Sequence, residues 1–145
     1  MSKTQTKRET ADEVWAQLLR MTRLQRDRFV RISAELDLSP GDVRTLLTLD
    51  DEQGRPMGQL ARLWRCDASY VTAMVDRLEQ RGLVERRSAQ PDRRVKQATL
   101  TAEGSRMRAA VLTRLHELPP ELLELDHATL VTVRDALSRL QAIEL

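Results

Sequence analysis

The side chains that could do chemistry in this sequence are mainly arginines and lysines, because nucleophiles and metal ligands are few. There is one cysteine, Cys66, and the two histidines, His116 and His127, lie eleven residues apart across a Pro-Pro step. Zinc sites use closely spaced sets of Cys and His ligands, which this spacing does not provide. Phosphate-loop, dinucleotide-binding and nucleophile-elbow motifs are also absent from the sequence. We therefore expect no enzymatic activity, no cofactor and no metal.

The charged residues are unevenly distributed, although the whole chain has a net charge of only +2. Residues 62–96 contain nine Arg and Lys against five Asp and Glu, whereas residues 116–145 contain two against six. A basic middle and an acidic end predict that the middle binds a polyanion and that the end has another role.

The basic middle has the pattern of a helix-turn-helix followed by a hairpin. A short helix over 58–64, with Gly58 as its N-cap, is followed by the turn 65–67. A second helix over 68–81 has Asp67 as N-cap and Gly82 as the residue that ends it. Strands over 83–87 and 95–100 then flank a tip rich in turn-forming residues. This order predicts a winged helix-turn-helix.

In such a domain the second helix enters the major groove of DNA, and the wing contacts phosphates or the minor groove. Hydroxyls and a small side chain on the outer helix face, with guanidiniums in the wing, suit these two tasks. Asp92 is expected to pair with Arg94 and to orient it. The predicted DNA-binding residues are Ser69, Tyr70, Thr72, Ala73, Arg77, Arg86, Arg87, Arg93, Arg94 and Lys96.

Several of these residues have a second interpretation. Arg77 could form a surface ion pair instead, and Tyr70 could pack across the helix-turn-helix. Arg93 and Arg94 could be solvated wing charges, although the adjacent helix pattern favours DNA contact. Cys66 precedes a helix N-terminus, which can lower a thiol pKa and allow redox sensing, but a small packed residue is the favoured interpretation.

Helices are predicted on both sides of this domain. Thr10 and Glu13 have capping-box spacing, so a helix is expected from there to about Asp37, after a disordered tail over 1–9. Ser39-Pro40 begins another helix, and Thr101 caps the helix after the hairpin. Pro119-Pro120 interrupts that helix, and a last one starts near Asp126. No stretch approaches 18 apolar residues, the N-terminus lacks a signal core, and one cysteine suits a reducing compartment, so a cytoplasmic protein is expected.

The run over 67–104 resembles the signature of the MarR family of multiple antibiotic resistance regulators. The likeness continues upstream through 38–49 and Leu60-Ala61, so it covers nearly all of the chain after the tail. The matching elements in 67–104 are Val71-Thr72, Leu78-Glu79, Gly82-Leu83-Val84, Arg86, Asp92-Arg93-Arg94 and Leu100-Thr101-x-x-Gly104.

This resemblance implies a mainly α fold with a small β-wing. The winged helix-turn-helix would cover 38–104, and the terminal helices over 10–37 and 105–145 would form a dimerisation region. It implies a homodimer that binds double-stranded DNA at a pseudo-palindromic operator, acts as a repressor and responds to a small phenolic or lipophilic effector. The apolar residues expected in the dimer interface are Val14, Leu18, Leu130, Val133, Leu137 and Leu140.

Two other functions remain open for the same pattern. An architectural DNA-binding protein would show no preferred site, and a protein-interaction adaptor would use the winged fold without DNA. The Asp92-Arg93-Arg94 wing argues against the adaptor, and the varied outer face of the second helix argues against the architectural protein.

Overall fold

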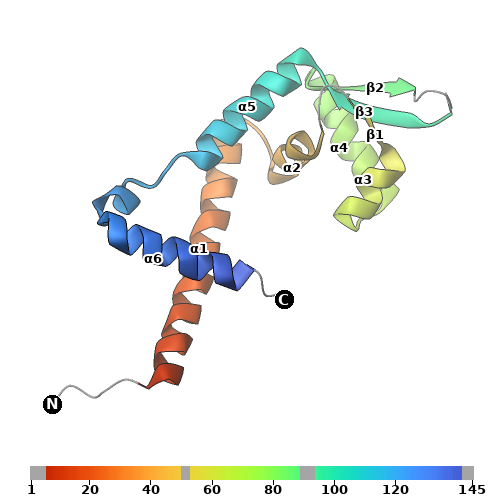
Figure 1. Cartoon of the computed structure of the whole chain (residues 1–145). Coiled ribbons are helices and arrows are strands. Elements are labelled where there is room, and N and C mark those ends of the chain that lie inside the picture. Colours follow the sequence, from red (N-terminus) through yellow and green to blue (C-terminus); the bar gives the residue numbers. More distant parts are fainter. Residues whose placement is uncertain (1–5, 50–52, 89–93, 142–145) are drawn as a thin grey trace. The chain divides into compact units, whose positions relative to one another are not determined.

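The computed structural model describes residues 6–49, 53–88 and 94–141, and in these ranges the chain is mainly helical with one small antiparallel sheet (Figure 1). The predicted fold class is therefore confirmed. The chain divides into two compact units, residues 1–115 and 116–145. None of the helices in the described part is both long and apolar enough to cross a membrane.

The first helix, α1 (Lys7–Glu35), begins one turn earlier than predicted. The hydroxyl of its N-cap, Thr6, accepts a hydrogen bond from the Glu9 amide, and the Glu9 carboxylate accepts one from the Thr6 amide. The predicted cap at Thr10 is wrong, because the same T-x-x-E spacing occurs four residues earlier and satisfies the amides there. Residues 7–9, predicted as part of a disordered tail, are helical, and residues 1–5 lie outside the described residues.

Helix α2 (Pro40–Thr48) begins as the sequence predicts. Ser39 is the N-cap, Pro40 occupies the first helical position, and a capping box joins Ser39 to Asp42. The helix buries Val43 and Leu46 and turns its other side away from the core.

Helices α3 (Met57–Trp64) and α4 (Ala68–Gln80) form the helix-turn-helix, and the chain passes between them through Arg65 in the left-handed conformation, with φ 50°. The predicted cap at Gly58 is wrong, because α3 starts directly after the short strand β1 (Arg55–Pro56) without a side-chain cap. Asp67 occupies the predicted N-cap position of α4, but its side chain makes no capping hydrogen bond.

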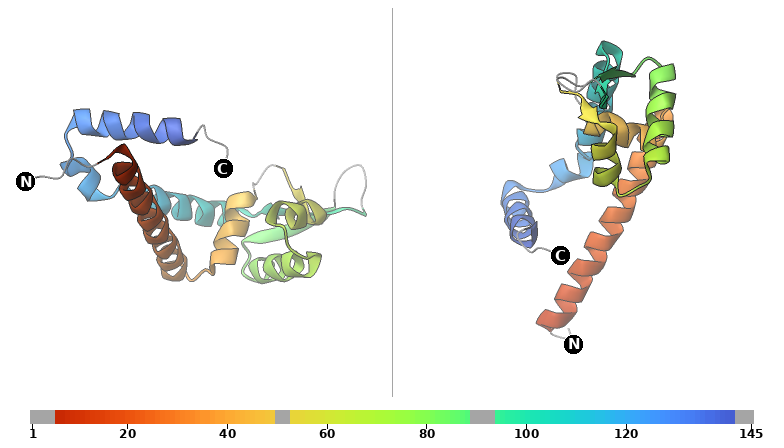
Figure 2. Two further views of the ribbon diagram at one scale, coloured as in Figure 1. Left: turned by 90° about the horizontal axis from the view of Figure 1, so that it is seen from below. Right: turned by 90° about the vertical axis from the view of Figure 1, so that its right-hand side faces the viewer.

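The sheet has the order β1-β3-β2 and all its pairs are antiparallel. Strands β2 (Val84–Ser88) and β3 (Lys96–Leu100) lie within one residue of the predicted hairpin strands. Figures 1 and 2 show α3 and α4 side by side next to this hairpin. Strand β1 was not predicted, because two residues, one of them a proline without an amide hydrogen, produce no alternating pattern.

The core of the first unit is built mainly from leucine and valine, with Trp64 and Ala98, and most of its residues come from α2, α3, α4, the sheet and the helix α5 (Ala102–His116). As predicted, Thr101 caps α5: its hydroxyl accepts from the Gly104 amide at 3.0 Å and donates to the Gly82 carbonyl at 2.6 Å. Gly82 itself, with φ 69°, ends α4 in the conformation that glycine adopts without strain. The wing and α5 are therefore tied to the end of α4.

The second unit contains the 3-10 helix η1 (Pro120–Glu124) and the helix α6 (His127–Gln141). Asp126 caps α6 by accepting a hydrogen bond from the Thr129 amide at 2.9 Å, close to the predicted start. None of the residues described over 116–140 is buried. The apolar side chains of this unit have no core of their own.

Candidate nucleic-acid interface

Helix α4 separates an apolar face from a polar one. Val71 and Val75 on the inner face are fully buried, whereas Ser69, Thr72 and Ala73 on the outer face are exposed. This division follows from the 3.6-residue helical period, because the inner residues recur three or four positions apart. The outer face offers two hydroxyls and one small side chain, which could contact phosphates, base edges or a thymine methyl group.

Tyr70 is exposed by 47% but lies against α2. Its hydroxyl oxygen is 3.2 Å from the position that a β-carbon on Gly41 would occupy. The side chain thus packs toward α2, a helix outside the helix-turn-helix pair that the second interpretation of this residue named. Its hydroxyl can still donate or accept a hydrogen bond at the edge of the outer face.

Arg77, one of the predicted DNA-binding residues, forms an ion pair within the fold, which was its second interpretation. Its Nε and Nη2 atoms lie 2.8 and 2.6 Å from Oδ1 of Asp42, and Nη2 also donates to the Ser39 hydroxyl at 2.9 Å. Burial would raise the pKa of Asp42, but the hydrogen bonds from Ser39 and the Arg77 guanidinium outweigh it and hold that pKa below its usual value. The sequence did not point to Asp42, because no spacing rule links two residues 35 positions apart.

Arg86 is also held inside the unit. Its guanidinium pairs with Asp76 at 2.5 Å and with Glu79 at 2.7 Å, and it approaches the Thr72 carbonyl at 3.4 Å. The backbone amide of Arg86 donates to the second Glu79 oxygen at 3.2 Å. Two carboxylates of α4 therefore bind the first strand of the wing through one residue.

The remaining basic residues lie along the hairpin. Arg87 pairs with Glu85, and the Lys96 ammonium donates to the Ser88 hydroxyl at 3.0 Å across the two strands. Arg94 is exposed. Arg93 and the Asp92 carboxylate that was expected to orient Arg94 lie outside the described residues.

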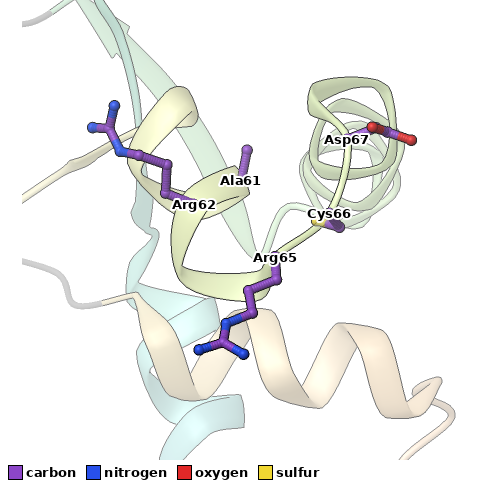
Figure 3. A pocket seen from close by; sticks show the side chains of 5 residues that line it. All are labelled: Ala61, Arg62, Arg65, Cys66 and Asp67. Atoms are coloured by element: carbon purple, nitrogen blue, oxygen red, sulfur yellow. The ribbon is translucent and has the colours of Figure 1, made fainter.

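A hollow of about 450 Å³ lies at the turn between α3 and α4. Figure 3 shows the guanidiniums of Arg62 and Arg65 pointing away from Cys66 in different directions. Cys66 is half-buried and packs against the core, which is the interpretation that the sequence favoured. Ala61 and Asp67 complete the lining.

A second hollow, of about 480 Å³, separates the end of α1 from the outer sides of α2 and α4. Arg44 stands 5.6 Å above the ring of buried Trp64, whose indole nitrogen donates to the Thr48 hydroxyl at 3.3 Å. The hollow thus combines apolar walls with a cation and a phenol. Its lining residues are Phe29, Pro40, Gly41, Arg44, Leu47, Thr48 and Tyr70.

The residues predicted for a dimer interface are exposed or half-buried, and none of them is buried. In the first unit Val14 is 49% exposed and Leu18 is half-buried. In the second unit Leu130 is half-buried, and the other three are at least 41% exposed: Val133, Leu137 and Leu140.

The described side chains include no group of three or more His, Cys, Asp or Glu that could hold a metal ion. Some of their ion pairs lie within one helix or strand, whereas others, such as Arg77–Asp42 and Arg114–Glu35, join different elements. Such pairs fix helices and strands relative to one another.

Residues 38–96 match the family model described as MarR family. No curated protein sequence matches the chain. The crystal structure of YusO from Bacillus subtilis has a TM-score of 0.82 at 20% identity, with 97% of this chain and 100% of that chain covered. A mutant of Staphylococcus aureus MepR, bound to an oligodeoxyribonucleotide, has a TM-score of 0.70 at 20% identity, covering 88% and 96%. Apo MarR from E. coli has a TM-score of 0.68 at 21% identity, covering 86% and 95%.

Proposed function

We propose, from the match of residues 38–96 to the MarR family model, that the protein is a homodimeric repressor that recognises a pseudo-palindromic operator in double-stranded DNA. The observation that carries the proposal is the position of α4. Its hydroxyl-bearing outer face is exposed next to a hairpin that displays Arg87, Arg94 and Lys96. On this proposal the protein acts in the cytoplasm, where promoter DNA is found.

The two parts of this surface have different tasks. The guanidiniums and the ammonium of the wing bind phosphates or enter the minor groove, which supplies affinity for any sequence. Ser69, Thr72 and Ala73 on α4 reach base edges in the major groove, which supplies the choice of sequence. The MepR mutant bound to an oligodeoxyribonucleotide has a similar fold, which supports DNA as the partner of this surface.

A dimer would explain the exposed apolar side chains of the terminal helices. Val14 and Trp15 of α1 and Leu137 and Leu140 of α6 are each exposed by at least 41%. Apolar surface of this extent on small elements usually marks a contact with another chain. Two copies would also present two α4 helices, which a pseudo-palindromic operator requires.

The hollow between α1, α2 and α4 gives a place for an effector that releases the protein from DNA. Its apolar lining suits an aromatic ring, and Arg44 and the Tyr70 hydroxyl suit a carboxylate or phenol. Because Tyr70 belongs to α4, a ligand in this hollow would contact the recognition helix directly. Such a ligand releases the protein from DNA only if it binds the DNA-free conformation more tightly than the DNA-bound one.

The proposal is tested by selecting genomic fragments with the purified protein at physiological salt and footprinting those retained. One protected pseudo-palindromic site close to a promoter is the expected result. Uniform and salt-sensitive binding with no preferred site would identify an architectural protein instead. An absence of DNA binding would favour the protein-interaction adaptor.

A further inference from the structure

Arg77 connects the last turn of α4 to the start of α2. Its guanidinium contacts Oδ1 of Asp42 through two nitrogens and the Ser39 hydroxyl through one of them. The Asp42 side chain is only 3% exposed, whereas that of Arg77 is 43% exposed. A carboxylate so deeply buried requires a compensating partner, and Arg77 is the charged residue that supplies it.

Asp42 is itself fixed by the helix that carries it. Its Oδ2 atom accepts a hydrogen bond from the Ser39 amide at 2.8 Å, and its amide donates to the Ser39 hydroxyl at 3.1 Å. One carboxylate oxygen thus caps α2 and the other holds α4. The cap leaves the Asp42 side chain little freedom to follow Arg77 if α4 moves.

The two helices also approach closely beside this pair. A β-carbon on Gly41 would lie 2.9 Å from the Met74 sulfur and 3.2 Å from the Tyr70 hydroxyl. The Met74 sulfur is in turn 3.1 Å from Nη2 of Arg77. Glycine at position 41 therefore lets the first turn of α2 lie directly against α4. The ion pair between Arg77 and Asp42 joins the same two helices beside this contact.

We infer that Arg77 is a positioning residue, which acts through buried Asp42 to set the recognition helix against α2, and that it does not contact DNA. The inference rests on the proposed function, since it assigns a role in site recognition. A phosphate contact through Nε or Nη2 would require the guanidinium to leave the buried Asp42 carboxylate without its charged partner, which is strongly unfavourable. Arg77 and Asp42 then act as one unit, and removal of either has the same effect on α4.

The test compares Arg77→Ala, Asp42→Asn and the double variant in the full-length protein. Affinity is measured for the selected operator fragment and for bulk DNA over a range of salt concentrations. We expect each single change to lower the preference for the operator at least about tenfold, with the double variant no worse than either. The slope of affinity against salt stays at the wild-type value, because no phosphate contact is lost.

A direct DNA contact gives a different pattern. Arg77→Ala would then lower the salt slope by about one, while Asp42→Asn would leave operator binding intact or strengthen it by freeing the guanidinium. That result would overturn the inference. Arg77→Lys, which keeps a charge next to Asp42, is expected to restore part of the preference.

Amide hydrogen exchange without DNA separates this inference from the proposed function. In both single variants we expect faster exchange along α4 and at the start of α2, with exchange over α6 unchanged. Unchanged exchange along α4 would overturn the positioning role, whether or not the protein binds DNA. Failure of the wild-type protein to bind any DNA would instead overturn only the proposed function.

Discussion

The carbonyl oxygen of Leu83 lies 1.9 Å from the position that a β-carbon on Gly104 would occupy. The same carbonyl accepts a hydrogen bond from the Thr101 amide at 3.1 Å. The start of α5 can therefore lie against Leu83, in the segment between α4 and β2, only because residue 104 has no side chain. This contact joins the wing to the helix that follows it.

Gly104→Ala should destabilise the protein by about 2–4 kcal/mol, because backbone must move to admit a methyl group. Chemical denaturation measures the change in the free energy of unfolding. Gly58→Ala is the matched control, since nothing lies within 4 Å of its β-carbon position and it is exposed in the first turn of α3. Alanine there should be neutral or raise stability by up to about 1 kcal/mol. Equal effects of the two substitutions would contradict the close contact.

The contact between Gly104 and Leu83 joins residues 21 positions apart, and contacts of this kind could not be predicted from the sequence. Local signals placed most elements correctly, because caps such as Ser39 and Thr101 and the glycine at 82 act within one turn of the chain. The same locality explains the error at α1, where two T-x-x-E spacings compete one turn apart. It also explains the missed strand β1, which exists only by pairing with β3.

The candidate interface shows the same division between local and distant information. Helical periodicity predicted that Ser69 and Thr72 are exposed while Val71 is buried. It could not predict that Arg77 faces Asp42 or that Arg86 faces Asp76 and Glu79. These ion pairs depend on tertiary packing, so arginines that look alike in the sequence have different surroundings in the fold.

The Asp42 carboxylate should make stability depend on pH. Its pKa is lower in the folded than in the unfolded chain, so the stabilisation is present above the unfolded value of about 3.9 and is lost as pH falls through the folded value. At pH 7 we expect Asp42→Asn to cost about 1–2 kcal/mol, since the Arg77 side of the pair is partly solvated. Urea unfolding at pH 7 and pH 3 should show the difference from wild type shrinking at the lower pH. An unchanged difference would mean that Asp42 titrates normally.

Arg94→Ala should weaken binding to all DNA sequences alike. A wing residue that neutralises one phosphate contributes about one to the slope of log affinity against log salt, so that slope should fall by about one. Fluorescence anisotropy with operator and random duplexes measures both quantities. Arg8→Ala is the control, because Arg8 is exposed in the first turn of α1 and pairs with Asp12 of the same helix. Unchanged affinity for Arg94→Ala at physiological salt would remove this residue from the interface.

Leu137→Asp should dissociate the proposed dimer. Leu137 is 41% exposed on α6, and none of the residues over 116–140 is buried. In the proposed dimer, the partner subunit would cover this apolar side chain. A carboxylate at the centre of such an interface would be desolvated without a partner, which typically costs several kcal/mol. Sedimentation equilibrium should give the monomer mass for the variant at concentrations where the wild type has twice that mass. Operator binding should fall with it, since a single α4 contacts only one half-site.

Ser138→Asp provides the control for this experiment. It introduces the same residue into the same turn of α6, but Ser138 is polar and exposed, and its hydroxyl donates to the Arg134 carbonyl of its own helix. We expect this variant to retain the wild-type mass and operator affinity, so that loss in Leu137→Asp cannot be attributed to the effect of aspartate on the helix. If Leu137→Asp stays fully dimeric, the subunits meet through another surface. If both variants become monomeric, the interface extends around α6 to its polar side.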